Sequence, residues 1–174
     1  MKTITILRHS IRAAGQNLSP EGVALAREAA KKLNPEYNIV VTSDLQRAIE
    51  TAEAMGFTVN EHNEILCPPG EIVDLEVYWD GDFDEFLPAY RQKKHLYEFA
   101  VKLREYIKTI AKSLPENGNA LIISHGGVVQ AAAAGCFPEK DFREFGRSPK
   151  YCEGIKIFIE GTEFKDINII RNVG

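Results

Sequence analysis

The chain has 174 residues, a length that suits one domain with a sizeable hydrophobic core. Hydrophobic residues make up 44% and charged residues 26%, which is ordinary for a globular protein, and the net charge of -4 argues against a general nucleic-acid or membrane-surface binder. No apolar stretch approaches the length of a membrane span, and no signal-peptide pattern opens the chain, so we expect a cytoplasmic protein.

The cysteines are few and scattered. Cys67, Cys136 and Cys152 are odd in number and far apart in the chain, and no Cys-x-x-Cys pair occurs. This spacing supports neither a disulfide framework nor a zinc site, so we expect reduced thiols and no metal or other cofactor.

The first apolar run, residues 3–7, ends abruptly in Arg8 and His9, with Arg12 close behind. Its β-branched residues predict a buried strand of a parallel sheet, and such sheets bind ligands beyond the carboxyl ends of their strands. Two guanidinium groups repel a metal cation but offer bidentate donors to a phosphoryl group, and the imidazole between them can act as a nucleophile. The alternative is that Arg8 and His9 merely cap a surface strand.

A helix and a second strand are predicted next along the chain. Ser19 is a natural N-cap, and Pro20 a natural first residue, for a helix over residues 20–33. A second buried strand is predicted over residues 38–43, and its polar end opens a helix that closes near residue 55 and carries Arg47 one turn in. Taken alone, Arg47 reads as a solvated charge on a helix face.

The middle of the chain is less regular. Residues 57–59 suggest a short edge strand, and residues 61–85 form an acidic, irregular region of the kind that often makes a functional loop. Residues 84–114 have helical periodicity, which predicts a short helix followed by a longer one past Pro88.

A third buried strand is predicted over residues 120–124. It ends in His125, and Gly126 and Gly127 then open a helix at once, as at the exits of the earlier strands. A helix N-terminus with two glycines leaves backbone N–H groups free to approach an anion closely.

The last third of the chain completes the sheet. We expect a loop with a short helix near residues 139–144, then an antiparallel hairpin formed by residues 154–160 and 163–169. The predicted fold is α/β: residues 1–174 form one three-layer α/β/α domain, whose sheet is mostly parallel with an antiparallel C-terminal hairpin.

Four stretches together resemble the histidine phosphatase superfamily, also called phosphoglycerate-mutase-like, and they occur in the order the superfamily has them. They are Leu7-Arg8-His9-Ser10, the helix start Leu18–Gly22, the helix Ser43–Ala52 with its Ser-x-x-x-Arg-Ala-x-x-Thr-Ala pattern, and Ser124-His125-Gly126-Gly127. A fifth stretch, Leu66–Glu71, is similar to a segment of the small bacterial phosphohistidine phosphatases.

The resemblance implies a role for each matching residue. His9 is expected to be the phosphorylated nucleophile, Arg8 and Arg47 to bind the phosphoryl oxygens, and His125 to complete the pocket. Arg12 resembles the second arginine of the acid-phosphatase branch and is expected to be a further phosphate ligand. Such a pocket neutralises the phosphoryl oxygens by positioned positive charge and needs no metal.

Two departures from the superfamily pattern affect the chemistry. Ser10 stands where glycine is usual, and Gly126 follows His125 where the acid-phosphatase branch has its proton-donating aspartate. The proton donor is therefore sought in the acidic region. Glu71 is the first choice, with Glu76 and Asp80 as the alternatives.

The function predicted is a phosphatase that hydrolyses phosphomonoesters or protein phosphohistidine through phosphohistidine at His9. Its partners are then a phosphorylated small molecule or a phosphoprotein, with no nucleic acid and no membrane. One alternative, suggested by Ser10 and the unlocated acid, is a catalytically weak module that binds phosphate or phosphopeptides. A phosphoglycerate-type mutase is the less favoured alternative.

Overall fold

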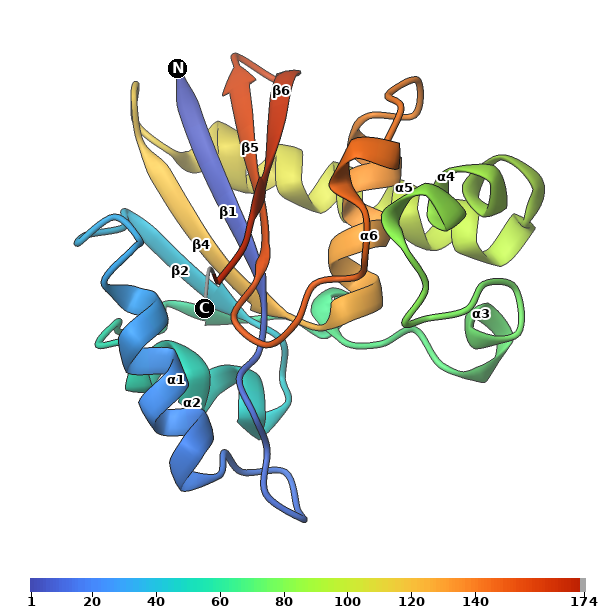
Figure 1. Ribbon diagram of the computed structural model, residues 1–174. Helices are drawn as coiled ribbons and strands as arrows, with labels where there is room; N and C mark the ends of the chain where they lie inside the picture. The colour runs from blue at the N-terminus through green and yellow to red at the C-terminus, as the bar shows by residue number, and fades with distance from the viewer. Residues whose placement is uncertain (173–174) are drawn as a thin grey trace.

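The computed structural model describes residues 1–172 and is built on one sheet of six strands in the order β3-β2-β4-β1-β5-β6 (Figure 1). The strands are β1 (Lys2–Arg8), β2 (Ile39–Thr42), β3 (Glu61–His62), β4 (Asn119–Ser124), β5 (Gly154–Glu160) and β6 (Glu163–Ile170). Neighbours from β3 to β1 pair in parallel, whereas β5 and β6 are antiparallel. The predicted mostly parallel sheet with an antiparallel hairpin is confirmed.

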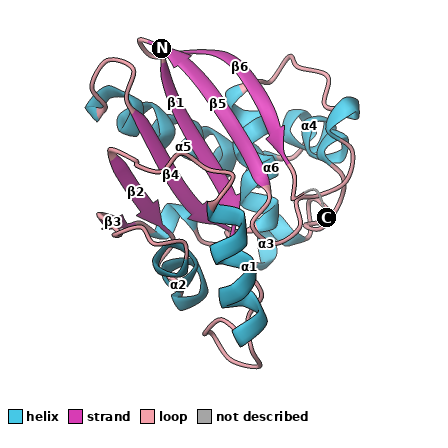
Figure 2. Ribbon diagram, turned by 60° about the vertical axis from the view of Figure 1, so that its left-hand side comes forward, coloured by secondary structure: helices cyan, strands magenta, loops and turns pink. Residues whose placement is uncertain are grey.

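Helices cover both faces of this sheet, which gives the three layers (Figure 2). On one face lie α1 (Pro20–Ala30) and α2 (Gln46–Ala54); on the other lie α4 (Phe83–Gln92), α5 (Lys94–Ser113) and α6 (Gly126–Cys136). Alternate strand residues point to opposite faces. Ile6 accordingly packs under α5 and α6, while Leu7 packs with α1 and α2. In the described part of the chain, no helix is long and apolar enough to cross a membrane.

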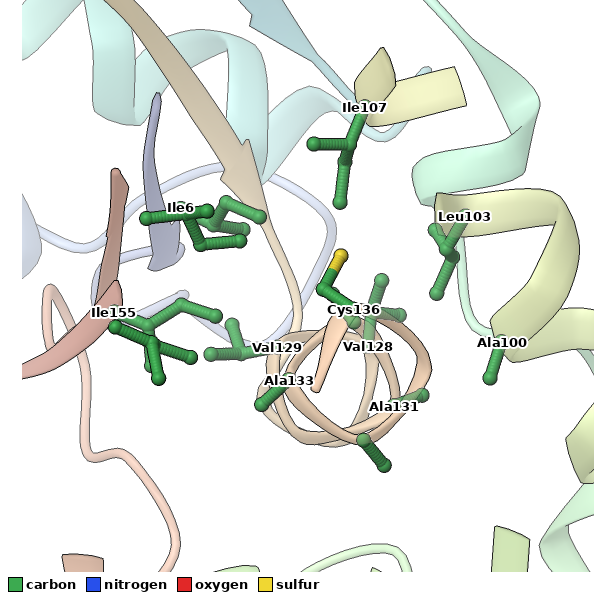
Figure 3. Close-up of a cluster of buried hydrophobic side chains, with 14 of the residues drawn as sticks. Ile6, Ala100, Leu103, Ile107, Val128, Val129, Ala131, Ala133, Cys136 and Ile155 are labelled. Atoms are coloured by element: carbon green, nitrogen blue, oxygen red, sulfur yellow. The ribbon is translucent and has the colours of Figure 1, made fainter. Parts of the chain in front are cut away.

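The larger core lies between the sheet and α6, which is buried along its whole length (Figure 3). Small residues allow this burial: Ala100 of α5 approaches α6 so closely that a Cβ on Gly135 would lie 2.5 Å from its carbonyl oxygen. A helix buried all round needs apolar residues on every side, and the sequence of α6 supplies them. The sheet and α6 thereby form a rigid support for the residues at their ends.

Strand register brings the three predicted polar exits together. Arg8 of β1 is level with Ser124 of β4, so His9 and His125 both leave the sheet one residue later, side by side. Thr42 of β2 is level with Ile123, which places Ser43 beside the same exit. The carboxyl ends of β1, β4 and β2 therefore meet at one point.

The cap predicted for α1 is confirmed, since Ser19 accepts a hydrogen bond from the Gly22 backbone N–H and Pro20 is the first helical residue. Gly22 is required here for close approach: a Cβ on it would lie 2.0 Å from the carbonyl oxygen of Ile11. This contact fixes α1 against the segment that follows His9.

Several boundaries differ from those predicted. Residues 57–59 are not a strand; the edge strand is β3, because Val41 and Thr42 pair with Glu61 and His62 instead. Pro88 lies inside α4, and the break before α5 comes at Lys93. A proline five residues into a short helix removes only one backbone bond, which buried neighbours such as Phe86 offset.

Irregular regions also hold short helices. The acidic region contains a 3₁₀ turn at Glu64–Leu66 and a short helix α3 (Glu71–Asp74), and the predicted helix near residues 139–144 is a 3₁₀ turn at Arg143–Phe145. The three cysteines are unpaired, with Cys136 and Cys152 buried and Cys67 partly exposed.

Candidate active site

A cavity of about 230 Å³ opens at the carboxyl ends of β1 and β4. The residues that line it come from six separate segments: Arg8, His9, Arg12, Arg47, Pro68, Trp79, Asp80, His125, Gly126 and Tyr151. The structure therefore brings together Arg8, His9, Arg12, Arg47 and His125, five of the six predicted site residues. Three of these are arginines, so the cavity carries a local positive charge in a chain that is acidic overall.

His9 is only 6% exposed, and both of its ring nitrogens have partners. Its Nδ1–H donates to the Ser10 carbonyl oxygen at 2.7 Å, and its Nε2 accepts from Arg47 Nε at 3.2 Å. This pairing leaves the lone pair on Nε2, the nitrogen on the cavity side. Burial, with Arg47, Arg8 and Arg12 nearby, lowers the pKa of His9 to about 4 against the bond to Ser10, so the imidazole is neutral at physiological pH.

Arg47 links the two histidines. It is the second residue of α2 and is 9% exposed, which overturns its reading as a solvated helix charge. Besides the bond to His9, its Nη2 lies 3.4 Å from His125 Nδ1, and its Nη1 contacts the side chain of Gln16. Burial lowers its pKa, and the positive charge of Arg12 adds to this effect. A guanidinium held between two imidazoles can exchange these contacts for hydrogen bonds to an anion that enters the cavity.

His125 is the N-cap residue of α6 and is 3% exposed. Its Nε2–H donates to Ser43 Oγ at 2.8 Å, which turns Nδ1 toward Arg47. Burial first, then His9, Arg47 and Arg8, lower the pKa of His125 to about 2. The ring centroids of His9 and His125 are 5.1 Å apart, so the two neutral imidazoles face one small volume.

Arg8 is held on two sides. Its Nη1 donates to the Pro149 carbonyl oxygen at 3.1 Å, and its guanidinium carbon lies 4.7 Å from the centre of the Tyr151 ring. Its Nε is buried and has no hydrogen-bond partner within residues 1–172. A Cβ on Gly126 would lie 3.2 Å from Arg8 Nη1, so glycine at the start of α6 leaves room for this guanidinium.

Ser10, which replaces the usual glycine, fits without strain. It is fully buried, its Oγ donates to the Gly22 carbonyl oxygen at 2.7 Å, and its backbone N–H donates to Thr51 Oγ1 at 2.9 Å. Thr51 Oγ1 in turn donates to the carbonyl oxygen of Arg47. The serine side chain therefore points away from the cavity and ties the His9 segment to α1, while its backbone ties the segment to α2.

Known proteins share the fold of this chain and part of its sequence. A phosphoserine phosphatase from Entamoeba histolytica superposes with a TM-score of 0.70 at 17% identity, over 99% of this chain and 98% of that chain. Residues 8–66, which include Arg8, His9 and Arg47, match the family model of the histidine phosphatase superfamily (branch 1). Residues 8–66 are therefore similar to this superfamily, and the chain has the fold of the phosphatase on which it superposes.

Other structures of the same fold have different activities in their names. A phosphoglycerate mutase from Bacillus anthracis has a TM-score of 0.64 at 19% identity, covering 98% of this chain and 92% of that chain. A mycobacterial glucosyl-3-phosphoglycerate phosphatase has a TM-score of 0.63 at 18% identity, covering 97% of each chain. A search of curated proteins found no match. At these identities the likeness establishes the histidine phosphatase fold and leaves the substrate open.

The three candidate carboxylates lie in different surroundings. Glu71, the first choice, is the exposed first residue of α3 and does not line the cavity. Glu76 accepts bonds from His95 Nδ1 at 2.7 Å and from the Leu96 backbone N–H, so it caps the start of α5. Asp80 alone of the three lines the cavity, with Oδ1 lying 3.8 Å from Arg8 Nη1.

Trp79 forms one wall beside Asp80. Its indole packs against the start of α6, where a Cβ on Gly127 would lie 2.1 Å from Trp79 Cε2. Gly127 therefore makes space for the Trp79 side chain. The sequence suggested anion binding as the reason for this glycine, and the packing of Trp79 is a second reason. Trp79 also contacts Phe86 and Phe99, which fix its ring from behind.

Tyr151 comes from a loop that the sequence did not identify. A buried carboxylate, Glu153, organises this loop: it accepts bonds from Arg147 at 2.6 Å and from Arg171 at 3.0 Å. Although burial raises the pKa of Glu153, these bonds and those of nearby backbone N–H groups lower it to about 2. Asn172 completes the network by donating to the Tyr151 carbonyl oxygen at 2.8 Å. No short-range pattern in the sequence joins residues so far apart.

Within residues 1–172, no group of three or more His, Cys, Asp and Glu side chains is placed to hold a metal ion. The positive charge of the cavity comes from guanidinium groups instead.

Proposed function

We propose that this protein is a phosphatase that hydrolyses phosphomonoesters or protein phosphohistidine through a phosphohistidine intermediate at His9. The observation that carries the proposal is the His9 ring itself. Its Nδ1–H is fixed to the Ser10 carbonyl, so the lone pair is on Nε2, where it accepts from Arg47 until a phosphoryl group in the arginine-lined cavity takes over that contact. Nucleophilic catalysis requires a neutral imidazole in a defined orientation, and both conditions are met.

The first half-reaction transfers the phosphoryl group to the enzyme. His9 Nε2 attacks phosphorus while the bond from phosphorus to the leaving-group oxygen breaks. Arg8, Arg12 and Arg47 neutralise the charge on the three equatorial oxygens, which is the main requirement of phosphoryl transfer. His125, whose ring centre lies 5.1 Å from that of His9, offers a further polar contact.

Asp80 is the proton donor in this proposal, in place of Glu71. Its carboxylic acid gives a proton to the leaving-group oxygen, and its carboxylate then takes a proton from the water that attacks the phosphohistidine. The bond from phosphorus to Nε2 breaks, releasing inorganic phosphate and regenerating His9. Asp80 is supported because it is the one candidate carboxylate that borders the cavity.

Two observations suggested the alternative of a weak binding module, and both have another explanation. Ser10 fits the fold without entering the cavity, and Asp80 supplies a carboxylate beside Arg8. We further propose that the protein acts in the cytoplasm without nucleic acid as a partner; the three free cysteines and the net charge of -4 favour this placement.

The decisive experiment is hydrolysis of 4-nitrophenyl phosphate in the presence of EDTA. Turnover by the parent, its loss in His9→Ala, and an acid-labile, base-stable phosphoenzyme in the parent alone are the expected results. Turnover that survives His9→Ala contradicts the mechanism.

The proton donor is tested by leaving-group dependence. In Asp80→Asn we expect kcat/KM for an alkyl phosphate to fall by about 100-fold, since a general acid contributes about that much. The loss for 4-nitrophenyl phosphate should be much smaller, because nitrophenolate leaves without a proton. Glu71→Gln is the matched control. If kcat/KM for the alkyl phosphate falls more in Glu71→Gln than in Asp80→Asn, Glu71 is the proton donor.

A further inference from the structure

A second and larger hollow, of about 850 Å³, adjoins the catalytic cavity and shares Pro68 with it. Its walls come from the end of β2, the turn after β3, the α3 segment and the first half of α5. They include Asp44, Leu45, Glu64, Ile65, Cys67, Pro69, Ile72, Glu98, Phe99 and Lys102. We call it the flanking groove. Pro68 is the residue common to both linings, so the two hollows lie on either side of it.

Apolar side chains make up much of the groove and continue beyond it. Leu45, Ile65 and Phe99 line it, and Ile72 on its rim is 61% exposed. Further along the same segment, Leu75 is 89% and Tyr78 71% exposed. Large apolar side chains grouped in this way commonly mark a surface that binds a partner.

The charges of the groove are opposite to those of the catalytic cavity. Asp44, Glu64 and Glu98 line the groove, together with Lys102 and with His95, whose Nδ1 is bonded to Glu76. Arginines dominate the catalytic cavity, where Asp80 is the acidic exception. An anion is thus favoured on one side of Pro68, and a cation with apolar groups on the other.

We propose that the flanking groove binds the polypeptide on either side of a phosphorylated residue, with basic and apolar side chains near the phosphorylation site. This inference rests on the proposed function and deepens it by naming the substrate class. A small phosphorylated carboxylate is disfavoured, because its carboxylate would face Asp44, Glu64 and Glu98. A small cationic ester satisfies the charge but leaves Ile65, Ile72 and the rest of the apolar lining in water, whereas a peptide satisfies both.

The test uses two phosphoserine peptides that differ only in their flanks: one has lysine and leucine beside the phosphoserine, and the other has glutamate and leucine. We expect the parent to have the higher kcat/KM for the lysine peptide. In Glu64→Lys and in Glu98→Lys the ratio of the two kcat/KM values should fall by about tenfold, since an exposed charge pair contributes up to about fivefold and reversal makes it repulsive.

Glu116→Lys is the matched control, because it makes the same charge change at the opposite end of the sheet, in the turn before β4. It should keep the parent's ratio. Ile72→Ser should lower kcat/KM for the lysine peptide several-fold, and less so when glycine replaces leucine in the peptide. A ratio that Glu64→Lys and Glu98→Lys leave unchanged, or a parent that prefers the glutamate peptide, overturns the proposal.

Two further measurements separate this proposal from the proposed function. If phosphoethanolamine is hydrolysed as efficiently as the lysine peptide, the proposal that a polypeptide occupies the groove is overturned. A small cationic ester is then the occupant. If neither peptide nor 4-nitrophenyl phosphate is hydrolysed, the proposed function fails, and fluorescence anisotropy of the labelled peptides still tests the groove. Preferential binding of the lysine peptide that Glu64→Lys abolishes supports the groove in that case, and equal binding of both peptides overturns it.

Discussion

Because the pKa of His9 is low, the free energy of unfolding should depend on pH. One substitution isolates the contribution of His9. Burial, with Arg47, Arg8 and Arg12 nearby, lowers the pKa of His9 from 6.5 to about 4. Between these two values the unfolded chain binds a proton that the folded protein does not. The contribution of His9 is therefore constant above pH 6.5, and stability falls as the pH drops from 6.5 toward 4.

The size of the effect follows from the two pKa values. Between pH 7 and pH 5, an imidazole with pKa 6.5 in the unfolded state and about 4 in the folded state removes about 2 kcal/mol from the free energy of unfolding. His9→Asn removes the titrating group, so the variant should lose about 2 kcal/mol less than the parent over the same range. His125 is present in both proteins, and burial, the largest cause of its low pKa, acts in both.

The assay is urea unfolding at pH 7, 6 and 5 in a buffer without phosphate, since a bound anion would raise the pKa of His9. Gln16→Ala changes a neighbour of Arg47 that does not titrate, so it should keep the parent's pH dependence. NMR titration of the imidazole measures the pKa directly. Equal losses in the parent and His9→Asn, or an imidazole that titrates near pH 6.5, would refute the argument.

Three further predictions concern single contacts. Arg47→Lys should lower kcat/KM for 4-nitrophenyl phosphate by about 100-fold or more with the circular dichroism spectrum unchanged, because one ammonium cannot replace a fork of donors to the phosphoryl oxygens. Ser10→Ala should lower the free energy of unfolding by about 1 kcal/mol, measured in urea, because it removes the buried hydrogen bond from Ser10 Oγ to the Gly22 carbonyl; activity should stay within about twofold. Gly127→Ala should displace Trp79, seen as a change in tryptophan fluorescence with a raised KM, and an unchanged spectrum would contradict the packing described.

Strand exits were the part of the site that the sequence could predict. Apolar runs ending in Arg8-His9 and in His125 identified the strands, and parallel pairing then brought their carboxyl ends together. Arg47 needed the resemblance as well, because one arginine near a helix start has no distinctive local pattern. The placement of Arg12 in the cavity agrees with the expectation for it, while its role stays a prediction.

What sequence reasoning missed depends on contacts between distant segments. Tyr151 reaches the cavity because a loop is folded around buried Glu153, which Arg171 binds from the last strand's end. Ser43 was seen as a helix start, although its hydroxyl orients His125. The resemblance of Leu66–Glu71 to the small bacterial phosphohistidine phosphatases favours Glu71 over Asp80, but only the course of the chain decides which carboxylate borders the cavity.

The network around Glu153 also bears on when the site forms during synthesis. Arg8 belongs to β1, yet Tyr151 lies against it in a loop that Arg171 and Asn172 bind. A growing chain that still lacks residues 171 and 172 can fold its parallel strands, but it lacks the contacts that hold the loop in place. Phosphate binding should therefore appear only once these two residues have joined the fold.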